Sequence, residues 1–179
     1  MKYKENKAYK ISLFGILGAL ALVISLFENI FLPDLPFLPA GAKPGLSNII
    51  TMFTASFAGF GGAIYITLIK ALFAFITRGT TAALMSLGGG VLSTIALCVM
   101  IRYEGKNLSF IGIGIICAVM HNLGQLVCAC IISGTPELLN YGKYLLVFAL
   151  VSGALTGLIL NVVMPRLKGL LMNKNQTQP

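Results

Sequence analysis

The sequence is poor in charge. Only 10% of its 179 residues are charged and 57% are hydrophobic, whereas about 25% of the residues of a typical soluble protein are charged. A soluble domain of this composition would expose large apolar patches to water. The composition therefore excludes a soluble globular protein and predicts an all-α integral membrane protein. The length suits one compact helical bundle and leaves no room for a soluble catalytic domain.

Acidic side chains are scarcer still. The chain has one aspartate, Asp34, and four scattered glutamates, Glu5, Glu28, Glu104 and Glu137. No two are adjacent or on one helical turn, whereas Mg²⁺ needs several oxygen ligands in an octahedral array. The four cysteines lie within apolar runs and have neither metal-ligand spacing nor an obvious disulfide context; they are Cys98, Cys117, Cys128 and Cys130. We therefore expect no metal, no cofactor and no catalytic constellation, and the absence of a Walker A motif assigns any ATP-driven step to a partner.

The positive charge is concentrated at the two ends of the chain. The net charge is +8, and seven of the cations flank the first and last apolar runs: Lys2, Lys4, Lys7, Lys10, Arg166, Lys168 and Lys174. Basic flanks of this kind set membrane orientation by remaining on the cytoplasmic side. We therefore expect a multi-pass protein of the bacterial cytoplasmic membrane, in contact with the lipid bilayer, with both termini cytoplasmic and no nucleic-acid partner.

The apolar runs predict six transmembrane helices. A span needs about 20 apolar residues, and the run Leu46–Thr77 is too long for one span and short for two. Two cytoplasmic termini require an even number of crossings, so we divide this run at Gly59–Gly62 and expect Pro165 to end the last helix. The predicted helices are Tyr9–Leu32, Leu46–Ala58, Ala63–Thr77, Ala82–Ile101, Ser109–Ile132 and Tyr144–Met164. The predicted organisation is a basic N-terminus at 1–9, a transmembrane domain at 10–166 and a cytoplasmic tail at 167–179.

A Pro- and Gly-rich stretch, Leu38–Asn48, joins the first two predicted helices. Gly41 and Gly45 allow tight turns or a close approach to a ligand, and Lys43 lies between them. One interpretation is an ordinary outer loop. The other is a loop whose Gly41 and Gly45 close over a bound solute.

Polar residues gather in the outer half of the predicted bundle. If alternate helices run outward, this half collects a set of candidate solute-binding residues: Glu28, Lys43, Asn48, Lys70, Arg78, Ser86, His121, Asn122 and Gln125. Lys70 is the most informative, because a charge at the bilayer centre costs at least about 2.5 kcal/mol and must find a partner. It either pairs with Glu28 or contacts a solute, and the His121–Gln125 segment either joins helices by hydrogen bonds or lines a pocket.

Three segments resemble a known family. They are GAKPGLSN at 41–48, SLGGGVLS at Ser86–Ser93 and HNLGQL at His121–Leu126, and the resemblance covers Gly15–Leu167. The chain resembles the Gx transporter family, whose members are also named heptaprenyl diphosphate synthase component I, and which is similar to the substrate-binding (S) components of energy-coupling factor importers. The resemblance implies six helices and a ligand pocket near the outer face. Family members usually carry arginine near the position of Lys70, and lysine keeps the charge but loses bidentate recognition.

The resemblance also implies a partner. Small residues on the first helix of S components contact an energy-coupling transmembrane subunit that works with ATPases, and Gly15 and Ala19 match this spacing. We therefore expect a substrate-binding membrane subunit of a small-molecule importer, for an anionic vitamin- or isoprenoid-type precursor. The alternative is a non-catalytic membrane accessory subunit of a heptaprenyl diphosphate synthase, because one aspartate cannot build the Asp-rich site of such a synthase. A standalone secondary transporter is the weaker third hypothesis.

Overall fold

The computed structural model describes residues 7–31, 45–103 and 109–173, and these residues form helices joined by short turns. Gly41 and Lys43, both predicted to contribute to the site, lie outside the described residues. The elements in chain order are α1 (Lys7–Phe31), α2 (Asn48–Arg78), α3 (Thr80–Met100), η2 (Ile101–Tyr103), α4 (Phe110–Ser133), η3 (Pro136–Tyr141) and α5 (Gly142–Asn173). The prediction of an all-helical protein with apolar helices that suit a membrane is confirmed.

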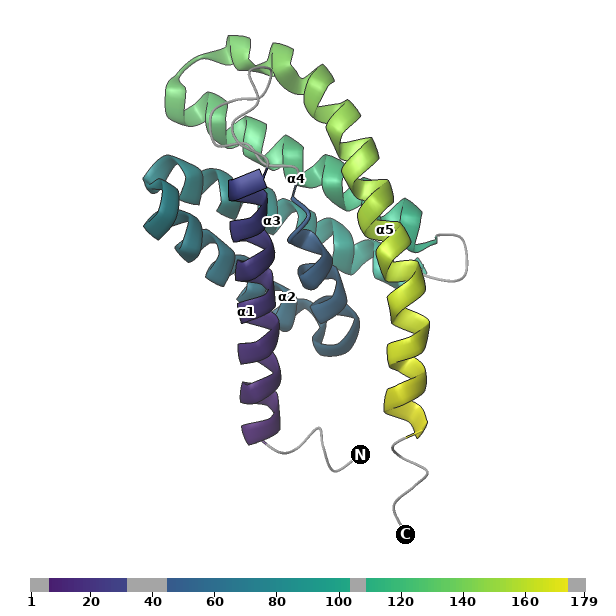
Figure 1. Cartoon of the computed structure of the whole chain (residues 1–179). Coiled ribbons are helices and arrows are strands. Elements are labelled where there is room, and N and C mark those ends of the chain that lie inside the picture. The colour runs from purple at the N-terminus through teal and green to yellow at the C-terminus, as the bar shows by residue number, and fades with distance from the viewer. Residues whose placement is uncertain (1–6, 32–44, 104–108, 174–179) are drawn as a thin grey trace.

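The predicted division of the second apolar run is a kink within α2. Gly59 has φ 65° and ψ −158°, while the helix continues on both sides. We call Asn48–Ala58 the short arm of α2, and the two arms run in different directions in Figure 1. At 1.5 Å per residue the short arm is about 16 Å long, too short to cross a bilayer. Five helices of the described chain are long and apolar enough to span a membrane, so a sixth crossing depends on this short arm.

The last helix continues beyond its predicted end. Pro165 lies inside α5, which runs on to Asn173, so the prediction that Pro165 terminates the helix was wrong. Proline removes one backbone donor, which breaks many helices in water. Helices of membrane proteins tolerate proline more readily, because neighbouring groups and small local adjustments satisfy the freed carbonyl.

Close backbone contacts at glycine residues hold α3, α4 and α5 together. A Cβ added to Gly124 of α4 would lie 2.6 Å from the carbonyl oxygen of Gly88 in α3. A Cβ added to Gly157 of α5 would lie 2.6 Å from the carbonyl oxygen of Phe110 in α4. Only glycine permits backbones to approach this closely, as is common where membrane helices cross.

Helix α1 is attached more loosely. It packs mainly on α2, through a small core of Leu17, Ala21 and Ile66. In the most apolar 18-residue stretch of α1 only 22% is buried within the protein, against 33–44% in the corresponding stretches of the other four candidate spans. Gly15 and Ala19 are exposed, and a Cβ on Gly15 would meet nothing within 4 Å. The small-residue face of α1 is therefore open within this chain.

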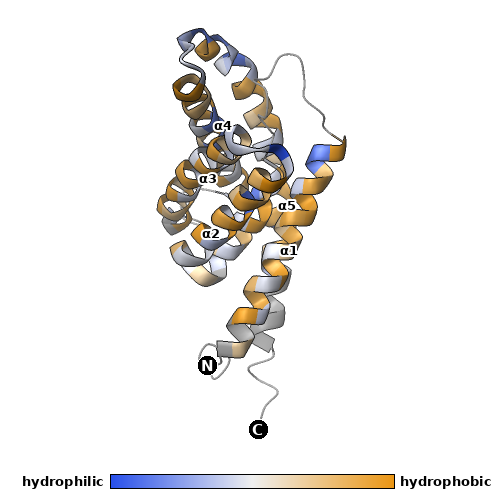
Figure 2. Ribbon diagram, turned by 90° about the vertical axis from the view of Figure 1, so that its left-hand side faces the viewer, coloured by the Kyte–Doolittle hydropathy of each residue, from blue (hydrophilic) through white to orange (hydrophobic). Residues whose placement is uncertain are grey.

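The start of α1 and the end of α5 lie at the same end of the molecule (Figure 1). We call this the terminal end, and the opposite end, where α1 finishes, the pocket end. Figure 2 shows hydrophobic residues along most of each helix and hydrophilic residues in the last turn of α1. This arrangement places the polar groups of the pocket end far from the start of α1 and the end of α5.

Candidate solute-binding site

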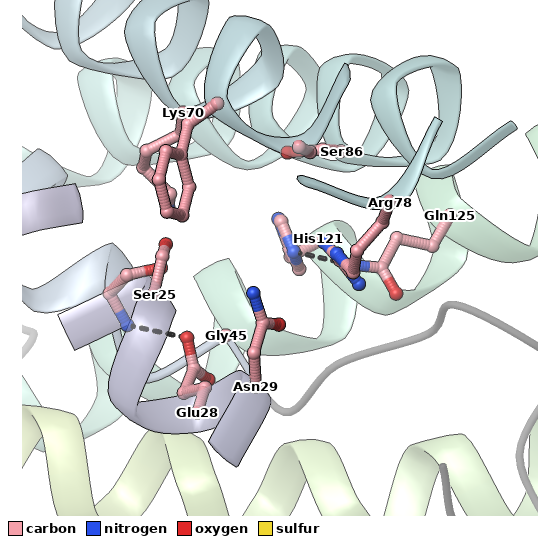
Figure 3. Close-up of a pocket in the computed structure, with 12 residues that line it drawn as sticks. Ser25, Glu28, Asn29, Gly45, Lys70, Arg78, Ser86, His121 and Gln125 are labelled. Carbon is pink, nitrogen blue, oxygen red and sulfur yellow. Dashed lines mark hydrogen bonds between the residues drawn. The ribbon is translucent and has the colours of Figure 1, made fainter. Parts of the chain in front are cut away.

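A polar cavity lies at the pocket end, between α1, both ends of α2, α3 and α4 (Figure 3). Its volume is about 30 Å³, which is room for one or two water molecules. The residues that line it are Ser25, Glu28, Asn29, Gly45, Ser47, Lys70, Phe73, Ala74, Arg78, Ser86, His121 and Gln125. Most of these side chains are polar, so the cavity suits a hydrogen-bonding or charged group rather than an apolar one.

Glu28 connects α1 to the beginning of α2. The backbone N–H of Leu46 donates to Glu28 Oε1 at 2.6 Å, and that of Ser47 donates to Oε2 at 3.3 Å. The first N–H groups of a helix have no partner within it, and a carboxylate is favoured at this positive end of the helix dipole. Glu28 is only 3% exposed, so the fold uses a buried carboxylate to satisfy these donors.

Lys70 is held by a neutral partner. Its ammonium Nζ donates to Asn48 Oδ1 at 2.7 Å, and the side chain is 7% exposed. The carboxylate of Glu28, the predicted alternative partner, is hydrogen-bonded to backbone N–H groups instead. Asn48 thus positions the ammonium group at the cavity without neutralising its charge.

His121 and Gln125 form the α4 wall of the cavity. Gln125 Nε2 lies 2.7 Å from His121 Nε2, and both side chains are buried. If the amide nitrogen donates, as its chemistry requires, the neutral ring carries its hydrogen on Nδ1. That Nδ1 atom is on the side of the ring that faces Gly89 of α3, and it donates its hydrogen to the backbone there. His121 therefore joins α4 to α3 through Nδ1 and lines the cavity with the opposite edge of its ring.

Gly45 brings the start of α2 against this wall. Its φ is 80°, a value that favours glycine. A Cβ at this position would lie 2.8 Å from Asn48 Nδ2 and 3.2 Å from His121 Cδ2. The residue predicted to close a loop therefore lies buried against the histidine, where a larger side chain would not fit.

A family model for heptaprenyl diphosphate synthase component I matches residues 17–163. The chain belongs to this family. Comparison with curated proteins and with solved structures found no match. The expected likeness to S components of energy-coupling factor importers stays a prediction.

The structure brings most of the predicted site residues of this family member together. Those that line the cavity are Glu28, Gly45, Lys70, Arg78, Ser86, His121 and Gln125. Asn48 contributes through its hydrogen bond to Lys70. Asn122 does not line the cavity; its Nδ2 donates to the carbonyl oxygen of Leu145 in α5 at 3.0 Å. Asn122 therefore joins α4 to α5, the interhelical alternative that the sequence had left open for this segment.

Sequence reasoning missed five lining residues: Ser25, Asn29, Ser47, Phe73 and Ala74. A signal for three of them was present in the helical spacing. Ser25 and Asn29 lie three residues before and one residue after Glu28, and Phe73 and Ala74 follow Lys70 by three and four positions. Residues three or four apart share a helix face, so Ser25 and both followers of Lys70 could have been added to the site.

The described residues hold no group of three or more His, Cys, Asp or Glu side chains that could bind a metal ion. What the cavity does contain is a lysine, an arginine, an imidazole and amide groups around one carboxylate that is already hydrogen-bonded. Such a set can bind and orient an anionic group.

Proposed function

We propose that this member of the heptaprenyl diphosphate synthase component I family is a membrane subunit that binds a small solute through an anionic group. Its binding site is the cavity at the pocket end, with Lys70 and Arg78 facing the negative charge and His121 and Gln125 supplying hydrogen bonds. The subunit itself carries out no chemical conversion. The solute belongs to the anionic vitamin- or isoprenoid-type precursors.

The buried lysine is the observation that carries this proposal. A charged side chain within the hydrocarbon region costs at least about 2.5 kcal/mol, and such residues mark functional sites by default. The partner of Lys70 is the neutral Asn48, while Glu28 is engaged with the backbone. An anion that enters the cavity would provide the compensating charge, and in low dielectric that attraction is stronger than in water.

The small volume of the cavity limits the size of the group that it accepts in this conformation. A volume of about 30 Å³ is far below the roughly 300–1,000 Å³ of sites that bury a drug-sized ligand. A carboxylate or phosphate group therefore needs a lining element to move before it fits. The rest of a larger solute would extend from the cavity mouth.

The proposed cellular role is import. With basic ends on the cytoplasmic side, the pocket end faces the outside, where an importer meets its solute. The open face of α1 at Gly15 and Ala19 suits close packing against a helix of another subunit. That partner would be an energy-coupling transmembrane subunit with its ATPases.

Identification of the bound solute tests the proposal directly. The protein is purified in its native lipids, and molecules released on denaturation are identified by mass spectrometry, with Lys70→Met purified in parallel. We expect an anionic small molecule that accompanies the unmodified protein and is depleted in Lys70→Met. A neutral molecule carried equally by both proteins would contradict an anion-binding site.

The family description favours a second candidate function, a membrane component of a prenyl diphosphate synthase. In this case the chain anchors or regulates a soluble catalytic subunit, which supplies the Asp-rich magnesium site that one aspartate cannot build. Co-purification separates the two candidates. An Asp-rich soluble synthase bound at constant stoichiometry supports the second, whereas ATPase and coupling subunits support import.

A further inference from the structure

The start of α2 already holds an anion, because Glu28 of α1 reaches across to it. The N–H groups of Leu46 and Ser47 donate to its two carboxylate oxygens at 2.6 and 3.3 Å. Paired N–H groups at a helix start bind carboxylates and phosphates readily. Glu28 therefore occupies a ready-made anion site from a neighbouring helix.

Two further groups make this position more than a helix terminus. Lys70, 7% exposed, lines the same cavity, and its ammonium has three donors, of which one is given to Asn48. His121 is 4% exposed and lines the cavity too, and Gln125 fixes its ring by a hydrogen bond at Nε2. Figure 3 shows Glu28, Lys70 and His121 around one space. The site therefore offers more hydrogen-bond donors than the carboxylate of Glu28 satisfies.

The helix that carries Glu28 is the one best able to withdraw it. Helix α1 packs mainly on α2 and has the smallest buried share of the five candidate spans, 22%. Its core contacts, around Leu17 and Ala21, lie about two to three turns from Glu28 at 3.6 residues per turn. The last turn of α1 can therefore move while the packing nearer the terminal end persists.

We propose that the N–H pair of Leu46 and Ser47 is the subsite for the anionic group of the solute, and that Glu28 is its displaceable occupant. A carboxylate or phosphate takes over the two hydrogen bonds next to Lys70, and Glu28 swings out with the last turn of α1. This movement also enlarges a cavity that holds only one or two waters. The inference rests on the proposed function and adds the position of the anion and the element that opens.

A one-methylene change tests the displacement. Glu28→Asp keeps the negative charge but shortens its reach, so the N–H pair is vacated. Because the sequence has no tryptophan, Ile30→Trp, at an exposed position in the last turn of α1, gives a single fluorescence reporter of that turn. Proteins in lipid nanodiscs are titrated with inorganic phosphate and, separately, with acetate at constant ionic strength. We expect the apparent Kd for at least one anion to fall by tenfold or more in Glu28→Asp.

Further variants distinguish the effect of the hydrogen bonds that Glu28 accepts from the effect of its negative charge. Glu137→Asp makes the same change in η3, away from the cavity, and should bind as the unmodified protein does. If Glu28 acts only through its charge, Glu28→Asp binds like the unmodified protein and only Glu28→Gln binds more tightly, which overturns the subsite. Weaker binding by Glu28→Asp would mean that Glu28 itself holds the solute, which overturns it too. The anion that gives the larger change identifies the class, carboxylate or phosphate.

Hydrogen exchange of the unmodified protein gives an independent readout. We expect phosphate or acetate to increase deuterium uptake in Ser25–Phe31, because the last turn of α1 is released, while the amides of Leu46 and Ser47 stay protected. Unchanged or decreased uptake in Ser25–Phe31 overturns the displacement. If no variant binds either anion, including Glu28→Asp with its vacated N–H pair, the anion-binding function fails as well. If the anions bind but Glu28→Asp has the same apparent Kd as the unmodified protein, only the proposed subsite is wrong and the anion-binding function stands.

Discussion

At the residue scale, Lys70 and Glu28 are each held by neutral groups. The ammonium of Lys70 meets the amide oxygen of Asn48, and the carboxylate of Glu28 meets two backbone N–H groups. A direct ion pair would have neutralised both charges and left little field for a ligand. The separate partners keep the positive charge of Lys70 available inside a buried cavity.

Lys70→Met is expected to lower the affinity for phosphate or acetate by tenfold or more, a loss of about 1.4 kcal/mol. The reason is that the cavity loses a buried cation, while methionine fills a similar volume. The measurement is the same fluorescence titration, with Lys70→Arg as the variant that keeps the charge.

The stability of the same variant tests the alternative of an ion pair. If Lys70 mainly neutralised Glu28, Lys70→Met would lower the thermal midpoint and the added substitution Glu28→Gln would restore it. We expect no such recovery, because Glu28→Gln also weakens the hydrogen bonds at the start of α2. Full recovery in the double variant would falsify our assignment of partners.

At the element scale, α2 is the helix that shapes the site. Its short arm starts at the pocket and its long stretch after Gly59 returns to it, so Asn48 and Lys70 meet although 22 residues separate them. The reversal depends on the backbone of Gly59, at φ 65° and ψ −158°. This region is occupied almost only by glycine.

Gly59→Ala is expected to destabilise the protein by about 1–3 kcal/mol through backbone strain alone. Gly61→Ala is the matched control, because neither glycine has an atom within 4 Å of an added Cβ and only Gly59 has a positive φ. Gly61→Ala should be neutral or slightly stabilising, since alanine favours a helix. Thermal unfolding in the same detergent compares the two, and equal midpoints would exclude a strained position.

Two pairs of small residues with the same spacing differ in burial. Gly153 and Gly157 of α5 are buried against α4, and added Cβ atoms there would lie within 3 Å of α4 backbone atoms. Gly15 and Ala19 of α1 are exposed. Identical spacings therefore serve packing within the chain in one case and leave an open face in the other.

Gly157→Leu is expected to disrupt the α4–α5 contact and lower expression of folded protein, because overpacking costs about 1–3 kcal/mol or more. Gly15→Leu, like Ala19→Leu, should fold normally and bind phosphate normally but lose its membrane partner. Size-exclusion chromatography measures folding, and co-purification measures association. Loss of anion binding by Gly15→Leu with normal association would reverse the two roles.

At the scale of the whole molecule, the start of α1 and the end of α5 lie at the same end, opposite the end where α1 finishes (Figure 1). The short arm of α2 explains how five candidate spans achieve this. It carries the chain from the pocket end to the kink at Gly59, from which the rest of α2 returns. The candidate site lies at one end of the bundle, and the start of α1 and the end of α5 lie at the other. This arrangement suits the proposed subunit, which would bind its solute on one side of the membrane and work with ATPases on the other.

Membrane labelling checks this orientation. Cysteines introduced at Thr135 and Asn173 should react with an impermeant reagent from opposite faces of sealed vesicles, with Asn173 cytoplasmic. The unmodified protein is the control, because its four cysteines lie within α3 and α4. Reaction of both positions from the same face would rule out the proposed topology.

The sequence by itself determined the class of protein, the positions of most helices and the break at Gly59. These features are local: a low content of charge, apolar runs of membrane length, and a glycine-rich interruption. The gathering of Lys70, His121 and Arg78 was also predictable, because the alternating direction of successive spans assigns each residue to one half of the membrane.

Only the tertiary structure decided which partner each polar group takes. Asn122 and Gln125 are three residues apart, yet Asn122 bonds to α5 and Gln125 to His121. The continuation of α5 through Pro165 was likewise not predictable. Each of these outcomes depends on how helices rotate and pack against one another, which is set by side chains distant in sequence. Spacing within a single helix defines its faces, and the neighbouring helices determine what each face meets.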